Sequence, residues 1–187
     1  MTLTGAVTLG AGVTITTNNT TNDGNVSFSS TINGAQSLTI DAGTGSVTLS
    51  GATGGTTALT SMTVTASTIS LKAVTTTASQ SYTGTTTLNG NLSSTTAGSI
   101  TVTGATTLAT GAIQVSTNGA LDTDDITFTS TINGAQALTL NSGSLGDISI
   151  SGVIGGTTPL SSLTVSGGDA LTVAAVSTNG GVITLSN

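Results

Sequence analysis

The chain has 187 residues and a net charge of −6, and only 4% of its residues are charged, against roughly 25% in a typical soluble domain. All seven acidic residues are Asp, the single basic residue is Lys72, and there is no Glu, Arg, His or Cys. One cation cannot neutralise a phosphate backbone, and no apolar run approaches the ~20 residues of a membrane-spanning helix, so neither nucleic acid nor membrane insertion is expected.

Short triplets of the form apolar-Thr/Ser-apolar recur along the whole chain. Alternation with a period of two places both apolar residues on one face of a strand and the hydroxyl residue on the other. Gly, Asn, Ser and Asp, which favour turns, lie between the triplets. In chain order such triplets begin at Val7, Val13, Val26, Leu38, Val47, Met62, Ile69, Ile100, Ile113, Ile126, Leu138, Ile148, Leu163, Leu171 and Ile183, with Gln in the middle at Ile113.

The spacing between triplets favours a parallel β-helix. Val26 to Val47 is 21 residues, Val47 to Ile69 is 22, and Ile126 to Ile148 is 22. A nearly constant step of this size predicts coils of about 22 residues, each with two or three strands and each paired to the next at roughly 4.8 Å. About eight coils would then form a rod on the order of 40 Å long.

A second fold also fits the sequence, namely a pair of immunoglobulin-like β-sandwiches, one for each copy of a long repeat. The Asn-Gly pairs at 33–34 and 133–134 support it, because Asn-Gly flanked by alternating apolar residues often forms an antiparallel hairpin. Antiparallel pairing between Val26–Phe28 and Leu38–Ile40 would decide for the sandwich.

Two sequence blocks occur twice. Residues 26–40 return as 126–140 with the hexapeptide Thr-Ile-Asn-Gly-Ala-Gln unchanged, and residues 50–59 return as 151–160. The offsets are 128 − 28 = 100 and 152 − 51 = 101 residues. Internal repetition of this kind is typical of solenoids. We therefore expect a single β-solenoid, residues 1–187, made of nearly two repeats at about 1–99 and 100–187.

The repeated blocks predict turns and core rather than a ligand site. Asn and Gly tolerate the left-handed conformations of tight turns, and the apolar residues on either side are expected to face inward. The predicted turn residues are Asn33, Gly34, Asn133, Gly134, Gly54, Gly55, Gly155 and Gly156. The predicted core residues are Val26, Phe28, Leu38, Ile40, Ile126, Phe128, Leu138 and Leu140.

The remaining residue types offer little chemistry. Without His, Cys, Glu or Arg there is no base to activate a Ser and no cation to stabilise developing charge, so we expect no catalytic site, no cofactor and no enzymatic activity. Asp122, Asp124 and Asp125 form the only cluster of carboxylates. Alternate Asp residues on a turn can bind Ca²⁺, which prefers several oxygen ligands, but a solvated turn is the simpler interpretation.

The repeated blocks at 26–40 and 50–59 give the chain a style that resembles the repeat regions of large bacterial surface and secreted proteins, the filamentous-haemagglutinin-like β-strand-repeat adhesins. The resemblance covers most of the chain and implies a right-handed parallel β-helix, an extracellular or cell-surface location, and an adhesive or scaffolding role. It carries over no active residue.

The strand pattern continues to Leu185, two residues from the C-terminus. An uncapped solenoid end presents unpaired backbone groups that template further pairing. The expected function is thus a structural or adhesive segment of an extracellular fibre or giant surface protein, with self-association head to tail. The alternative is a module that binds carbohydrate or a host surface, for which an exposed aromatic or charged row would be needed.

Overall fold

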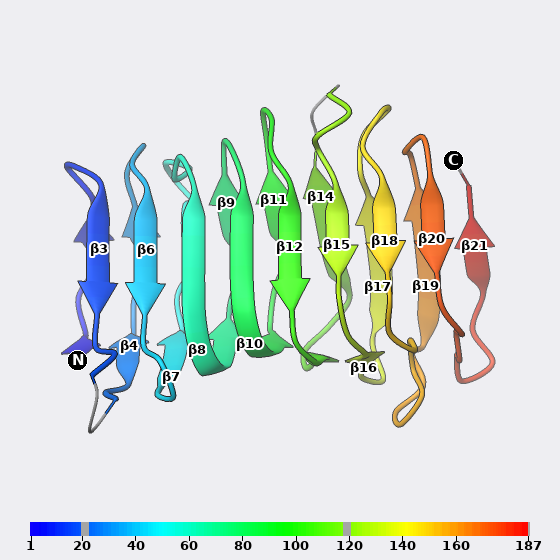
Figure 1. Ribbon diagram of the computed structural model, residues 1–187, viewed down its shortest axis with the longest axis horizontal. Coiled ribbons are helices and arrows are strands. Elements are labelled where there is room, and N and C mark those ends of the chain that lie inside the picture. Colours follow the sequence, from blue (N-terminus) through cyan, green and yellow to red (C-terminus); the bar gives the residue numbers. More distant parts are fainter. Residues whose placement is uncertain (20–22, 118–120, 187) are drawn as a thin grey trace.

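The protein is a parallel β-solenoid of about eight turns, seen in a computed structural model that describes residues 1–19, 23–117 and 121–186 (Figure 1). The described residues contain strands and no helix. Every strand pair is parallel, and Val26–Phe28 pairs with Val47–Leu49 of the next coil rather than with Leu38–Ile40. The solenoid prediction is therefore confirmed, and the alternative of tandem immunoglobulin-like sandwiches is wrong.

Each coil has three faces, which the chain visits in a fixed order. The first face holds β1 (Thr2–Leu3), β4 (Val26–Phe28), β7 (Ser46–Leu49), β13 (Thr106–Leu108) and β16 (Ile132–Asn133). The second holds β2 (Val7–Thr8), β5 (Ile32–Asn33), β9 (Val74–Thr76), β11 (Leu92–Ser94), β14 (Ile113–Thr117), β17 (Ala137–Asn141), β19 (Ser162–Ser166) and β21 (Ile183–Leu185).

The third face holds β3 (Val13–Thr16), β6 (Leu38–Asp41), β12 (Ile100–Thr103), β15 (Ile126–Phe128), β18 (Ile148–Ile150) and β20 (Leu171–Val173). Two longer strands, β8 (Met62–Leu71) and β10 (Gln80–Leu88), bend from the third face into the first face of the following coil. Third-face strands run down the near side of Figure 1 and second-face strands run up the far side, while the chain advances from left to right, so the winding is right-handed.

Coil length varies around the predicted value. Partners on the third face are 80 − 62 = 18 residues apart in the shortest step and 126 − 100 = 26 in the longest. The seven turns from Val13 to Leu171 average (171 − 13)/7, or about 23 residues. Longer and shorter coils differ mainly in the connections between faces. In the shortest step, the register of β8 and β10 also shifts by one residue between Thr83 and Thr85.

The lumen is filled by the inward residues of the triplets. All eight predicted core residues are buried, from Val26 to Leu140, and they form one continuous cluster along the axis. Each buried Leu, Ile, Val or Phe side chain contributes about 1.5–3 kcal/mol through removal of apolar surface from water. The charge-poor chain therefore holds its shape by lumen burial and by the backbone ladders between coils.

The two repeat copies do not stack on each other. The first-face line that starts at Val26 passes through Val47, Ile69, Thr86 and Thr106, and it then reaches Ile132. Ile126, the counterpart of Val26, lies instead on the third face, in line with Ile100. One repeat thus spans four turns plus two of the three faces, and the second copy is rotated by one face relative to the first. Phe28 and Phe128 both point inward, but from different faces.

Candidate functional site

The two repeated blocks contact each other across neighbouring coils. The side-chain oxygen of Asn33 accepts hydrogen bonds from the backbone N–H groups of Thr56 and Thr57, at 2.9 and 3.2 Å. Asn133 accepts the same pair of bonds from Thr157 and Thr158 at 2.9 and 3.2 Å. The blocks repeat together because the second block supplies the hydrogen-bond donors that the Asn of the first block accepts.

Glycine is required at the corner beside each Asn. Gly34 and Gly134 have φ of 123° and 132°, a region that residues with a side chain avoid. A Cβ atom on Gly34 would lie 2.4 Å from the Leu9 carbonyl oxygen, and one on Gly134 would lie 2.3 Å from that of Leu108. The repeated hexapeptide therefore meets a packing requirement of a corner.

The two glycines of each Gly-Gly pair differ in backbone conformation and burial. Gly54 and Gly155 are buried and have φ of 73° and 72°, and a Cβ on either would lie 2.1 Å from a carbonyl oxygen of the next coil. Gly55 and Gly156 are exposed and have no positive φ. Only the first glycine of each pair is demanded by backbone conformation.

Asn133→Ala should lower the free energy of unfolding by about 1–2 kcal/mol, because two backbone N–H groups lose their acceptor. Asn133→Asp keeps an acceptor oxygen at the same place and should retain most of that stability. Urea denaturation followed by circular dichroism measures both variants. Equal losses for Ala and Asp would show that the side-chain oxygen is not what holds the loop at 157–158.

The Asp cluster is built into the backbone of a corner. The carboxylate of buried Asp124 accepts bonds from Gly98 N–H at 2.5 Å and from Leu121 N–H at 3.1 Å. Asp125 accepts one from Asp147 N–H at 2.9 Å, and Asp122 is exposed. Within the described ranges, no three acidic side chains gather into a group that would hold a metal ion. The calcium hypothesis thus has no converging ligand set in its favour.

Asp23 holds another corner near the start of the solenoid. Its carboxylate accepts hydrogen bonds from Asn19 N–H at 2.7 Å, from Thr44 N–H at 2.5 Å and from the Thr44 hydroxyl at 2.8 Å. These bonds, the one from Asn19 first, lower the pKa of Asp23 below its ordinary value. The charged form is therefore the one that ties the two coils together, and this contribution is lost as the pH falls through the lowered pKa.

A small polar network lies inside the lumen. The hydroxyl of buried Tyr82 donates to Gln80 Oε1 at 2.8 Å, and Gln80 Nε2 donates to Thr76 Oγ1 at 3.1 Å and to the Ser93 carbonyl at 2.9 Å. Burial raises the pKa of Tyr82 far above its ordinary value. Since Phe28 and Phe128 are buried as well, none of the three aromatic rings offers a platform for a sugar.

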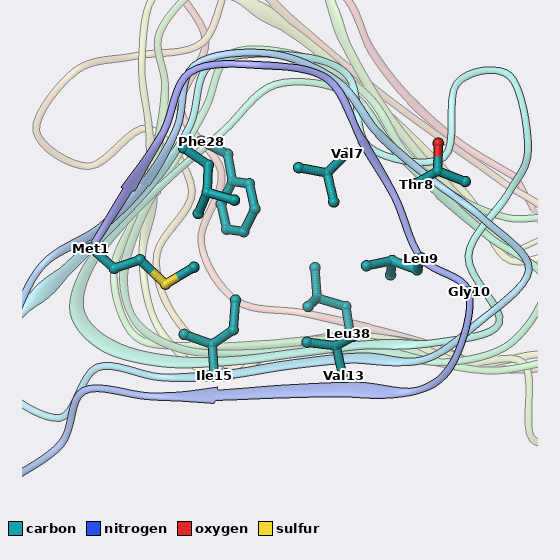
Figure 2. Close-up of a pocket in the computed structure, with 10 residues that line it drawn as sticks. Met1, Val7, Thr8, Leu9, Gly10, Val13, Ile15, Phe28 and Leu38 are labelled. Carbon is teal, nitrogen blue, oxygen red and sulfur yellow. The ribbon is translucent and has the colours of Figure 1, made fainter.

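The N-terminal end of the solenoid is an open apolar hollow of about 250 Å³. Figure 2 shows Met1, Val7, Leu9 and Ile15 pointing into this opening, whereas Thr8 points away from it. β1, β2 and β3 each pair with a strand on one side only. The hollow is lined by Met1, Leu3, Val7, Thr8, Leu9, Gly10, Val13, Ile15, Phe28 and Leu38.

The C-terminal end of the solenoid also exposes apolar side chains and a strand edge. Val182, Ile183 and Leu185 are 70%, 43% and 47% exposed, respectively, and β21 lies at the edge of its sheet with β19 as its partner. Apolar residues and an unpaired strand edge are therefore present at both ends of the rod. Such an edge is able to accept a further parallel strand.

The third face carries two columns of mainly hydroxyl side chains, and we call it the hydroxyl face. The register places like residues in successive coils, so Thr and Ser stack on one another along each column. The first column is Thr14, Thr39, Thr63, Ser81, Thr101, Thr127, Ser149 and Thr172. The second is Thr16, Asp41, Thr65, Thr83 and Thr103, continued by Thr129 and Ser151, whose N–H groups donate to the carbonyls of Val102 and Phe128.

Comparison with known proteins adds no relative. No protein-family model, curated protein or solved structure matches the chain. In the described part of the chain, no helix is long and apolar enough to cross a membrane.

Proposed function

We propose that the chain is a structural segment of an extracellular fibre or giant surface protein, of the kind found in bacterial β-strand-repeat adhesins, and that its coils extend by stacking end to end. The observation that carries this proposal is the matched pair of ends, each with an unpaired strand edge and exposed apolar lumen residues. A further solenoid turn from another copy would pair the free strand edge and cover the exposed apolar residues at the same time.

The charge pattern supports the same role. Stacking of the N-terminal end of one copy on the C-terminal end of another is favoured by a low density of charge, and the rod has seven Asp and one Lys in all. In the last coil, Ile183 and Leu185 are inward positions of a triplet that lack a covering coil, while Thr184 between them faces outward. Stacking would bury the first pair and leave Thr184 at the surface, in a heterologous contact that does not close.

The test is assembly of the purified chain at increasing concentration, followed by sedimentation velocity and negative-stain electron microscopy. We expect thin rods whose lengths are multiples of roughly 40 Å, the length of about eight coils at their usual spacing. Ile183→Lys should shift the chain to monomers, because it places a charge in the contact. Its neighbour Thr184→Lys adds the same charge on the outer surface and should still assemble.

A wild-type chain that stays monomeric at every concentration would contradict end-to-end stacking. Equal assembly of the two lysine variants would also contradict it, since the contact would then not involve the inward residues of the last coil. Circular dichroism of both variants confirms that the comparison is between folded proteins.

A further inference from the structure

The hydroxyl face forms a regular two-dimensional lattice. Neighbouring coils are about 4.8 Å apart, and the two columns, which are two residues apart along each strand, are separated by roughly 6.7 Å. The strands that carry them run side by side on the near side of Figure 1, from β3 to β20. None of the residues in either column is buried, so the hydroxyl and methyl groups lie at the surface.

The side chains in this lattice are stiff and almost uncharged. Thr is branched at Cβ and has few accessible rotamers, so a column of Thr on a paired backbone is ordered before any partner arrives. Asp41 is the one charged residue in the two columns. Asp125 and Asp147 lie beside the first column, and their carboxylates accept bonds from backbone N–H groups of the next coil.

The other two faces also carry hydroxyl residues, but not in two columns along the whole rod. On the first face, one column runs from Ser27 to Thr107 and then reaches Asn133, and the column beside it includes Lys72 and Asn89. On the second face, the outward positions next to the core line include Asn33, Gly54 and Asn141. The two repeat copies also differ at this face, because they are rotated by one face relative to each other. Thr127 and Thr129 lie on the hydroxyl face, whereas their counterparts in the first copy, Ser27 and Ser29, lie on the first face.

We propose that the hydroxyl face binds the surface of crystalline ice. The oxygen rows on the prism faces of hexagonal ice repeat at nearly the same two distances as the Thr columns. Each hydroxyl is able to donate to and accept from ordered water, and the adjacent methyl group gains from release of loosely held water on contact. A flat, rigid and nearly uncharged array presents both the hydroxyl and the methyl groups to the ice surface over successive coils. This activity is independent of end-to-end stacking.

The test is capture by growing ice. The chain is labelled with an amine-reactive dye, which couples to the N-terminus and to Lys72, an exposed residue that directly follows the first-face part of β8, away from the hydroxyl face. An ice sphere is grown slowly from a dilute solution, and the dye is measured in the ice and in the remaining liquid. We expect wild-type protein to enter the ice and to hold a gap between its melting and freezing points.

Two matched variants locate the contact. Thr103→Tyr places a bulky ring on the hydroxyl face and should reduce capture by ice roughly tenfold or more, a loss of at least about 1.4 kcal/mol. Thr107→Tyr places the same ring on the first face, four residues further along the chain, at another exposed outward position, and should leave capture unchanged. Thermal unfolding of both variants verifies that they are equally folded.

Three results would overturn the proposal. The first is rejection of the wild-type protein by ice as complete as that of a labelled control protein. The second is an equal loss of capture in the two Tyr variants, which would mean that no particular face is involved. The third is retention on crystalline cellulose that depends on Thr103, without capture by ice, which would assign the lattice to a polysaccharide surface.

Discussion

Gly134→Ala is expected to lower the free energy of unfolding by about 3–5 kcal/mol. Two costs add up at this corner. The backbone has a φ of 132°, which disfavours any side chain, and the new Cβ would lie 2.3 Å from the Leu108 carbonyl oxygen of the neighbouring coil. The coils at Leu108 and Gly134 would have to separate and break ladder hydrogen bonds.

Substitutions at two other glycines distinguish the cost of an unfavourable φ from the cost of a close contact between coils. Gly111 has a φ of 63° with open space where a methyl group would lie, so Gly111→Ala should cost only about 1–2 kcal/mol, the conformational term alone. Gly10 has open space and no positive φ, so Gly10→Ala should change stability by less than about 0.5 kcal/mol. Urea midpoints of the three variants give the comparison. Similar values for Gly134→Ala and Gly111→Ala would show that close contact between coils is unimportant.

Raising the pH above about 10 should destabilise the solenoid by about 1.4 kcal/mol per pH unit until the folded protein itself ionises or unfolds. The cause is Tyr82, whose pKa is raised by burial in the lumen. In the unfolded chain this phenol loses its proton near pH 10, whereas the folded state keeps it. The unfolded state then binds fewer protons, so stability is present below pH 10 and falls as the pH rises above it.

The chain is well suited to this measurement, because Tyr82 is its only Tyr, Lys72 its only Lys, and it has neither Cys nor Trp. Tyrosinate absorbance therefore reports Tyr82 alone and should appear together with the loss of β-sheet circular dichroism. Tyr82→Phe removes the ionising group and should flatten the alkaline slope, even though the loss of the bond to Gln80 lowers its stability at neutral pH by about 1–3 kcal/mol. The same slope in Tyr82→Phe would contradict this assignment.

Several features of the fold were predictable from residue spacing. The inward and outward sides of each strand follow from alternation, as at Leu38, Thr39 and Ile40, because neighbouring side chains on a strand point to opposite faces. The steps from Val26 to Val47 and Ile69 correctly matched partners in successive coils. The roles of Asn33 and Gly34 as corner residues also agree with the turn chemistry of these two residue types.

Other features required the tertiary structure. The partners of Asn33 lie in the next coil, at Thr56 and Thr57, and no local pattern reports contacts between residues that are more than 20 positions apart. The corner role of Asp124 was missed for the same reason, since its carboxylate holds Gly98 of the preceding coil. The sequence shows only that residue 124 is an Asp, and a carboxylate is able either to bind a metal ion or to accept a hydrogen bond from a backbone N–H group.

The sequence by itself thus favoured a parallel solenoid and predicted its coil length and core positions, because these depend on alternation and spacing along the chain. The tertiary structure decided which coils and faces meet. It rotated the second repeat by one face, since a 100-residue repeat does not contain a whole number of coils, and so separated Phe28 from Phe128. The same winding aligned Thr63, Thr101 and Thr127, which occupy unrelated repeat positions, into one column on the hydroxyl face.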